Sequence, residues 1–214
     1  MILGIIKVLG ILLFAYLIWR NLRENYKDEE LTSYAWIALL AFFIGGRLVF
    51  GLIHWGIWNN NWLDWLTPWS KPGMSYLGAY LSVFGTTWIL CKIRDWKIWA
   101  FAEDSLMVFL IFFGFLFLDE FIRSKFNLIT GLYGAIILVT LVFSSIIRNK
   151  YRSFVWYKSG KKGFTFFFAN AIVCLMLAIM SFYFKINLVY SILYSVGVLV
   201  SLVGLFILGE IYEK

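Results

Sequence analysis

A single arginine lies in the middle of an apolar run, in the stretch AFFIGGRLVFGLIHW at residues 41–55. Gly45 and Gly46 precede Arg47, and the chain's only histidine, His54, follows seven residues later. Positions i and i+7 share one face of a helix, so the cation and the imidazole lie on the same side. A guanidinium suits a phosphate because its planar fork donates two parallel hydrogen bonds. The stretch therefore predicts that Arg47 binds the phosphate of an anionic lipid, which the two glycines allow to come close.

Such a charge must be positioned by membrane-spanning helices, because the chain is strongly apolar. Of its 214 residues, 62% are hydrophobic and 14% are charged. Apolar runs long enough to cross a bilayer alternate with short charged stretches, and backbone groups in lipid must be satisfied within helices. We therefore expect an all-α, polytopic bundle that forms one integral-membrane domain over residues 1–214. About seven spans are predicted, at Ile2–Trp19, Tyr34–Trp55, Met74–Cys91, Ile98–Phe121, Leu128–Ile147, Phe164–Phe184 and Leu188–Leu208.

The first run, Ile2–Trp19, lacks a cleavage-type ending, so it is interpreted as a retained span, with a signal peptide as the alternative. Basic residues between the spans predict the orientation. Thirteen lysines and arginines fall on one side, and four fall on the other, namely Lys71, Arg123, Lys125 and Lys185. Because basic loops stay in the cytoplasm, the amino terminus is expected outside and the carboxyl terminus inside.

An aromatic stretch, WGIWNNNWLDWLTPW, follows the second predicted span. Its tryptophans step by three or four residues, which places them in one stripe if the stretch is helical. Asn60, Asn61 and Asp64 take the opposite side. This pattern predicts a Trp-rich segment in the headgroup plane, which either anchors the fold or gathers lipid.

Other polar residues have structural interpretations. Arg47 could form an internal ion pair with Asp119 or Glu120, although these acids could pair with Arg123 on their own helix instead. Glu103 and Asp104 would stabilise the amino terminus of the fourth span. We expect Cys91 and Cys174 to be packing residues. The sequence contains no metal-ligand cluster and no phosphate-binding loop, so neither a metal nor a cofactor is predicted.

Three motifs occur in an order that resembles the prolipoprotein diacylglyceryl transferase family of bacteria. They are GGR late in the second span, PGMSYLGAYL opening the third, and AED opening the fourth. The family carries G-G-R, then G-M-S-F-H-G-G, then S-D, in a frame of seven spans with the same orientation. The positions that match are Gly45, Gly46 and Arg47 in the first motif, Gly73, Met74, Ser75 and Gly78 in the second, and Asp104 in the third.

The resemblance implies a specific reaction. Family members transfer the diacylglyceryl group of phosphatidylglycerol to the lipobox cysteine of a preprolipoprotein, at the outer face of the bacterial cytoplasmic membrane. They need no cofactor. Arg47 would then hold the phosphate with Gly45, Gly46 and Ser75, and a second group would help to deprotonate the thiol.

One departure from the family leaves the function open. Leu77 occupies the motif's histidine position, and a leucine cannot carry a proton. His54 could replace that histidine, because the reference pKa of histidine is about 6.5. Tyr76 and Tyr80 are less favourable bases, because the reference pKa of tyrosine is about 10. The alternatives are a relative that binds a phospholipid or a lipoprotein without turnover, and an unrelated small transporter.

The transferase hypothesis and the hypothesis of binding without turnover both predict an outward cavity between the second, third and fourth spans. Arg47 would face an anionic headgroup there. Small residues of the third span, Gly78, Ser82 and Gly85, step by four and three positions. Small side chains allow helices in a membrane to come close together. The third span is therefore expected to pack tightly against its neighbours.

Overall fold

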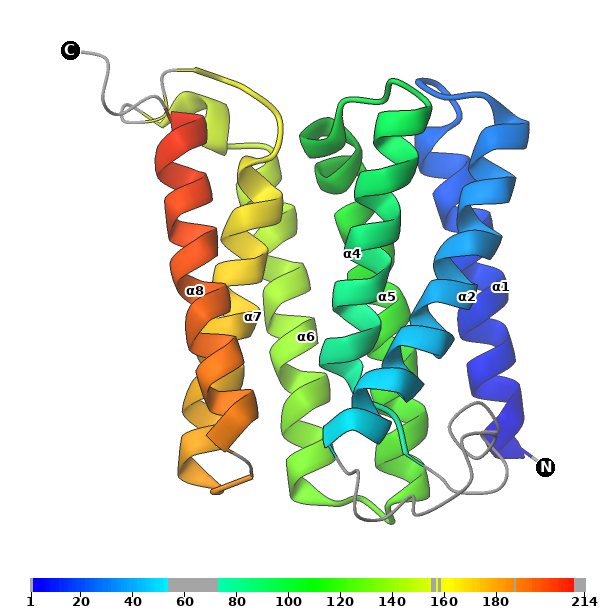
Figure 1. Ribbon diagram of the computed structural model, residues 1–214, viewed down its shortest axis with the longest axis vertical. Coiled ribbons are helices and arrows are strands. Elements are labelled where there is room, and N and C mark those ends of the chain that lie inside the picture. The colour runs from blue at the N-terminus through cyan, green and yellow to red at the C-terminus, as the bar shows by residue number, and fades with distance from the viewer. Residues whose placement is uncertain (1, 54–72, 155–156, 158, 187, 210–214) are drawn as a thin grey trace. The chain divides into compact units, whose positions relative to one another are not determined.

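The computed structural model describes residues 2–53, 73–154, 157, 159–186 and 188–209, and these residues form helices and their connections (Figure 1). The prediction of an all-α fold is confirmed. A short 3-10 helix at Tyr151–Ser153 joins two of the long helices. The seven α-helices of the described residues are α1 (Ile2–Leu22), α2 (Asp28–Ile53), α4 (Tyr76–Ile93), α5 (Ile98–Arg123), α6 (Leu128–Arg148), α7 (Phe164–Tyr183) and α8 (Leu188–Gly209).

Six of these helices are long and apolar enough to cross a membrane, namely α1, α2, α5, α6, α7 and α8. The prediction of a polytopic membrane bundle is therefore confirmed. The remaining helix, α4, has 18 residues and coincides with the third predicted span apart from two residues at each end. The largest difference is at α2, which begins at Asp28 rather than at Tyr34. Three acids, Asp28, Glu29 and Glu30, form its first turn, where negative charge favours a helix.

The chain divides into two compact units, residues 18–98 and residues 1–17 with 99–214. The first unit contains α2 and α4, and the second contains most of α1 with α5, α6, α7 and α8. Whether the whole chain acts as one integral-membrane domain stays a prediction. The Trp-rich segment and His54 lie outside the described residues.

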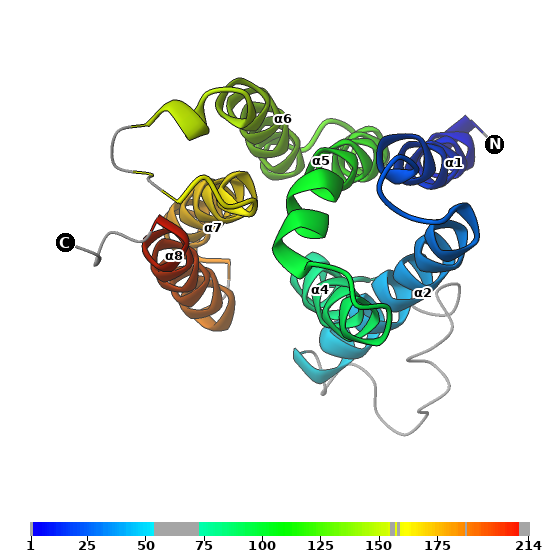
Figure 2. The same ribbon diagram turned by 90° about the horizontal axis from the view of Figure 1, so that it is seen from above.

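In the unit of residues 18–98, α2 packs against α4 through glycines (Figure 2). A Cβ atom at Gly45 of α2 would lie 1.7 Å from the hydroxyl oxygen of Ser82 and 3.1 Å from the carbonyl oxygen of Gly78. A Cβ atom at Gly78 of α4 would lie 2.4 Å from the Cβ of Val49. Only glycine at positions 45 and 78 allows this approach, so the predicted tight packing is confirmed at Gly78 and Ser82. It is not found at Gly85, where a Cβ atom meets no atom of the described residues within 4 Å.

Polar contacts hold the opposite ends of the same two helices. The buried Tyr34 hydroxyl lies 2.8 Å from the hydroxyl of Thr87, which also donates to the carbonyl of Val83. The Arg94 guanidinium donates to the carbonyl oxygen of Glu30 at 2.5 Å and thereby ties the end of α4 to the start of α2. Together with the glycine contacts, these bonds fix α2 and α4 at both ends.

The other unit contains the pair of α1 and α5. Phe14 of α1 is buried, and its ring lies 5.1 Å from that of Phe109 and 5.0 Å from that of Phe112. A Cβ atom at Gly10 would lie 3.1 Å from the Cβ of Phe115, so the two helices come close at that point.

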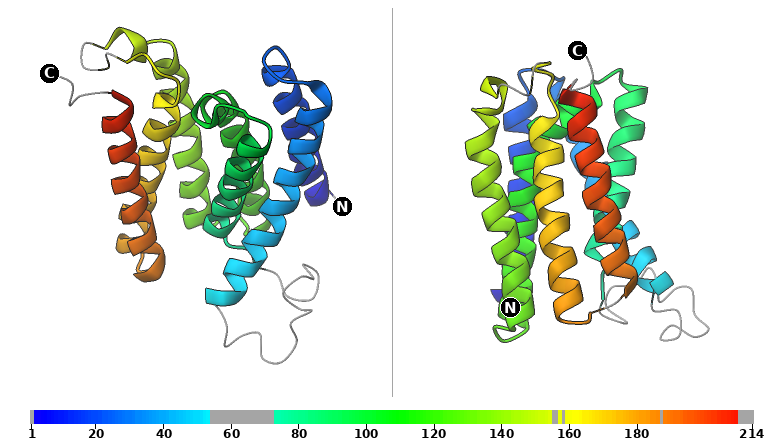
Figure 3. Two further views of the ribbon diagram at one scale, coloured as in Figure 1. Left: turned by 45° about the horizontal axis from the view of Figure 1, so that its top comes forward. Right: turned by 90° about the vertical axis from the view of Figure 1, so that its left-hand side faces the viewer.

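The hairpin of α7 and α8 is the most closely packed pair of that unit (Figure 3). A Cβ atom at Gly204 would lie 2.4 Å from the ring of Phe167. The Asn170 amide donates to the hydroxyl of Ser201 at 2.6 Å. Small residues and hydrogen bonds between side chains are how helices associate where water is absent.

The glycine contacts between α2 and α4 can be tested with a matched pair of substitutions in α4. Gly78→Ala places a methyl group against Val49, and overpacking of this kind costs about 1–3 kcal/mol. Gly85→Ala is the control, because a Cβ there meets no atom of the described residues within 4 Å. We expect Gly78→Ala to lower the melting temperature of the purified protein and Gly85→Ala to leave it equal or higher. Equal melting temperatures for the two variants would contradict the close contact.

Candidate functional site

Arg47 is buried in α2, with 6% of its surface exposed. It lies six residues before the end of the helix at Ile53, which is about 9 Å along the axis. Its guanidinium donates a hydrogen bond from Nη1 to the carbonyl oxygen of Gly73, at 2.6 Å. This bond orients the guanidinium toward the backbone of the segment that precedes α4.

The two glycines before Arg47 bring the segment that precedes α4 against α2. The amide of Ser75 donates to the carbonyl oxygen of Gly46 at 2.9 Å. A Cβ atom at Gly46 would lie 2.8 Å from the side chain of Met74. Gly73 has a φ of 151°, and a Cβ there would lie 2.3 Å from the ring of Phe50. The residues predicted from the first two motifs are therefore in direct contact.

Ser75 is the amino-terminal cap of α4 and is buried. Its hydroxyl oxygen accepts a hydrogen bond from the amide of Gly78 at 3.2 Å, which satisfies one of the donors that a helix start leaves unpaired. This contact accounts for a serine at the position. That Ser75 also contacts a phosphate stays a prediction.

Tyr76 and His54 are the two candidates for accepting the thiol proton. Tyr76 is the first residue of α4 and is partly buried, one residue after the serine cap. His54 directly follows the end of α2 but lies outside the described residues. Their catalytic roles stay predictions.

The sequence also allows Asp119 as an ion-pair partner of Arg47. In the structure, the basic residues beside Asp119 lie on α1 and α5. It is completely buried near the end of α5. Lys7 Nζ lies 3.3 Å from its Oδ2 atom, and Arg123 Nε lies 2.8 Å from the same oxygen. The predicted pairing of Asp119 with Arg123 on the same helix is confirmed. Neither oxygen accepts a hydrogen bond of good geometry within the described residues, so charge attraction holds the group.

Glu103 and Asp104 form a buried polar cluster in the unit that contains α5. Glu103 Oε1 accepts from the hydroxyl of Tyr151 at 3.0 Å, and its Oε2 accepts from the amide of Gly163 at 2.5 Å. Asp104 Oδ1 lies 3.1 Å from Arg148, and its Oδ2 lies 3.0 Å from Lys162. The two carboxylates therefore tie the connection between α6 and α7 to α5.

The prediction that these two acids stabilise a helix terminus is wrong. Helix α5 begins at Ile98, so Glu103 is its sixth residue, and its first turn contains no acid. The favourable interaction with a helix amino terminus falls off within the first turn. The partners of both carboxylates lie 44 to 60 residues further along the chain, where no local pattern indicates them.

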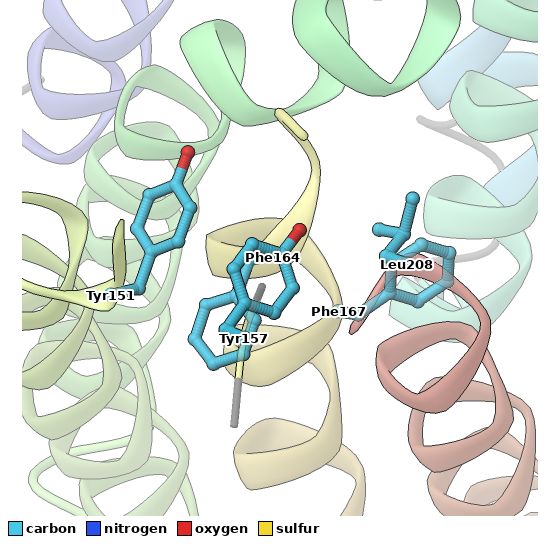
Figure 4. Packing of buried hydrophobic residues seen from close by; sticks show 5 residues of the cluster. All are labelled: Tyr151, Tyr157, Phe164, Phe167 and Leu208. Atoms are coloured by element: carbon cyan, nitrogen blue, oxygen red, sulfur yellow. The ribbon is translucent and has the colours of Figure 1, made fainter. Parts of the chain in front are cut away.

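Tyr151, the partner of Glu103, belongs to a cluster of buried aromatic side chains (Figure 4). The rings of Tyr151 and Phe164 stack with centroids 5.1 Å apart, and the ring of Tyr157 lies 4.8 Å from that of Phe164. Burial raises the pKa of the Tyr151 hydroxyl, so at neutral pH it stays protonated and donates to Glu103. Because the raised pKa favours the protonated form in the fold, this contribution to stability is lost only as the pH rises above about 10.

Cys91 and Cys174 are both buried thiols, as predicted for packing residues. A Cβ atom at Gly197 of α8 would lie 2.7 Å from the Cys174 sulfur, so this thiol fills the contact between α7 and α8. The polar residues that the sequence did not indicate are Lys7 as a partner of Asp119, and Tyr151, Arg148 and Lys162 as partners of the acids of α5. Each joins helices far apart in the chain.

A family model described as prolipoprotein diacylglyceryl transferase matches residues 2–201. The chain belongs to the prolipoprotein diacylglyceryl transferase family. This confirms the resemblance that the three motifs indicated. A search of curated proteins for individual relatives found no match. Family membership and the six apolar helices together establish a multi-pass membrane protein related to transferases of lipoprotein biosynthesis, which act on lipid and lipoprotein substrates.

The buried cluster on α5 can be tested by removing one charge. Asp104→Asn weakens the contacts to Arg148 and Lys162, and hydrogen bonds to charged groups are worth about 1.5–3 kcal/mol. The control is Asp95→Asn, because Asp95 is exposed and has a φ of 55°, which asparagine tolerates. We expect Asp104→Asn to lower the melting temperature and to speed proteolysis after Lys150. A variant as stable and as resistant as the control would show that the cluster does not hold the connection.

Proposed function

We propose that this chain transfers the diacylglyceryl group of phosphatidylglycerol to the cysteine thiol of a lipobox peptide in a preprolipoprotein. The proposal places the protein in the cytoplasmic membrane of a bacterium, with its amino terminus and the Arg47 site on the outer side. Membership of the transferase family supports the reaction class. The excess of basic residues between alternate spans supports the orientation.

The observation that carries the proposal is the position of the Arg47 guanidinium. It is buried, and it is bonded to the backbone of the second motif through the carbonyl of Gly73. A charge in a membrane costs about 2.5–3.5 kcal/mol on insertion scales, so such residues usually mark a functional site. A guanidinium that is already oriented can bind an anion with little further loss of side-chain freedom.

The proposed reaction makes a carbon–sulfur bond and breaks the carbon–oxygen bond between the glyceryl group and the phosphate. The electron pair of the broken bond leaves with the phosphate oxygen, so glycerol phosphate departs as an anion. Arg47 would stabilise the negative charge that develops there. The thiol proton passes to a general base, for which His54 is the first candidate and Tyr76 the second.

Binding of a phospholipid or a lipoprotein without turnover is the second candidate function. Leu77 stands at the histidine position of the second motif and cannot accept a proton. The hydroxyl of Ser75 accepts a hydrogen bond from its own helix, which gives this residue a structural role. The missing proton acceptor at Leu77 favours a relative that binds lipid without the reaction, in which Ser75 caps α4.

The test is transfer of a labelled diacylglyceryl group from phosphatidylglycerol to a lipobox peptide by the purified protein. We expect Arg47→Lys to reduce the rate about 100-fold to 1,000-fold, because the ammonium cannot reproduce the two parallel hydrogen bonds of a guanidinium. Arg20→Gln is the control, since Arg20 is exposed at the end of α1. The melting temperature of each variant shows whether it is folded.

The outcomes separate the two functions. Transfer by the unchanged protein that is lost in Arg47→Lys supports the transferase. Saturable binding of phosphatidylglycerol without transfer supports the binding protein, provided that Arg47→Lys weakens the binding. Transfer or binding that is equal in Arg47→Lys and Arg20→Gln would contradict a role for Arg47.

A pH profile tests the proposed base. If His54 accepts the thiol proton, the transfer rate should rise with pH through about 6.5, because only the neutral imidazole can take a proton. His54→Ala should remove this rise and lower the rate at neutral pH by about 100-fold or more. Tyr76→Phe is the comparison, since it removes only the phenol hydroxyl. A rise that persists in His54→Ala would assign the proton to another group.

A further inference from the structure

An apolar groove lies between α6 and α7, with a volume of about 360 Å³. Ile136 of α6 and Met180 of α7 form its floor, with only 8% and 6% of their surfaces exposed. Its sides include Met176, Ile179 and Tyr183 of α7, which are 41%, 60% and 79% exposed. Buried side chains below and exposed side chains beside them make a hollow that opens away from the helix pair.

The groove runs along the helices from one end of the pair. It extends on α7 from Phe184, the cap after the last turn, back to Met176, which is eight residues or about 12 Å. On α6 it begins at Leu132, one turn inside the start of that helix. Half of the hydrocarbon thickness of a bilayer is about 15 Å. The groove therefore has the length of one acyl chain within a single leaflet.

A positive charge stands at the end of the groove where α7 stops. Lys185 directly follows Phe184 and is exposed. Its φ of 50° turns the chain at this point. An exposed lysine at a helix end in a membrane protein carries its ammonium to the headgroup level, where lipid phosphates lie.

We propose that this α6–α7 groove holds one acyl chain of an anionic phospholipid, with the lipid phosphate at the ammonium of Lys185. The two methionines suit a flexible chain, because their unbranched side chains adapt to different shapes. The exposed Tyr183 ring lies at the headgroup end, the depth at which an aromatic ring with a polar hydroxyl is favoured. The inference depends on α6 and α7 and does not rest on Arg47 or on transfer.

A second membrane helix is a poorer occupant than an acyl chain. Helices α7 and α8 have 20 and 22 residues, which is about 30 Å, and a partner helix of this length would pack along its whole length. The groove extends about 12 Å, or little more than two helical turns. Its volume is at the lower end of the range of about 300–1,000 Å³ for small-molecule sites.

The test uses the full chain in nanodiscs of phosphatidylcholine that contain a trace of photoreactive phosphatidylglycerol, with a diazirine in the middle of one acyl chain. After illumination, mass spectrometry locates the labelled peptides. We expect most of the label on the peptides that contain Ile136, Met176 and Met180. Lys185→Gln should reduce this labelling about fivefold, which is the contribution of one basic residue near anionic headgroups.

Two matched controls separate the groove from lipid that surrounds the whole protein. Lys125→Gln removes an exposed lysine that also has a positive φ, at the turn between α5 and α6, and should leave the labelling unchanged. Met180→Phe narrows the floor and should reduce the labelling, whereas Leu138→Phe, on an exposed position of α6, should not. The melting temperature of each variant is measured first. If Met180→Phe melts at a lower temperature than the unchanged protein, Ile136→Phe replaces it.

Three results would overturn the proposal. Label spread evenly over exposed apolar positions, such as Leu12 of α1 and Val200 of α8, would show only surrounding lipid. An equal loss of labelling in Lys185→Gln and Lys125→Gln would show that the lipid phosphate does not lie at Lys185 in particular. If Ile179→Cys forms a disulfide between two copies of the chain, and the labelling by lipid is then lost, the groove is an interface between copies. Arg47→Lys should leave the labelling unchanged, so the result is independent of the transferase assay.

Discussion

The hydrogen bond from the buried Arg47 guanidinium to the carbonyl oxygen of Gly73 is the contact around which the motif residues are arranged. It forms only because α2 and α4 come close, which requires that Gly45 and Gly78 have no side chains. The amide of Ser75 and the carbonyl of Gly46 add a second main-chain link beside it. Backbone contact between the two motifs thus fixes the orientation of the guanidinium, and the proposed reaction would use a cation that is preorganised in this way.

The second unit solves the problem of buried charge in a different way. Asp119 is enclosed with two cations on a single oxygen, and Asp104 is shared between Arg148 and Lys162. Breaking a buried ion pair costs more than forming it stabilises, so such groups fix specific helix pairs. Charge compensation is therefore structural in this unit. In the other unit, the Arg47 guanidinium donates to the carbonyl oxygen of Gly73, which ties α2 to the segment before α4.

The sequence predicted the helices well and their long-range polar contacts poorly. Apolar runs of membrane length marked the spans, and glycine spacing marked the close approach at Gly78, because both signals are local. Gly85 shared the same spacing but meets no atom of the described residues within 4 Å, since spacing alone does not say which face has a neighbour. For the acids of α5, the local sequence pattern predicts a role at a helix start, which the fold contradicts. Their actual partners, Tyr151 and Gly163, are visible only once the chain is folded.

The arrangement around Arg47 separates two requirements of the proposed reaction. Holding an anion needs a fixed cation, and the bonds from Arg47 to Gly73 and from Ser75 to Gly46 orient the guanidinium through the backbone. Moving a proton needs a base, and Leu77 removes the one that the motif supplies in the family. Because the first requirement depends on backbone packing and the second on one side chain, we expect a chain that lacks the base to keep the arrangement around Arg47. The proposed transfer therefore requires His54 or Tyr76 to lie within reach of a thiol beside the lipid phosphate.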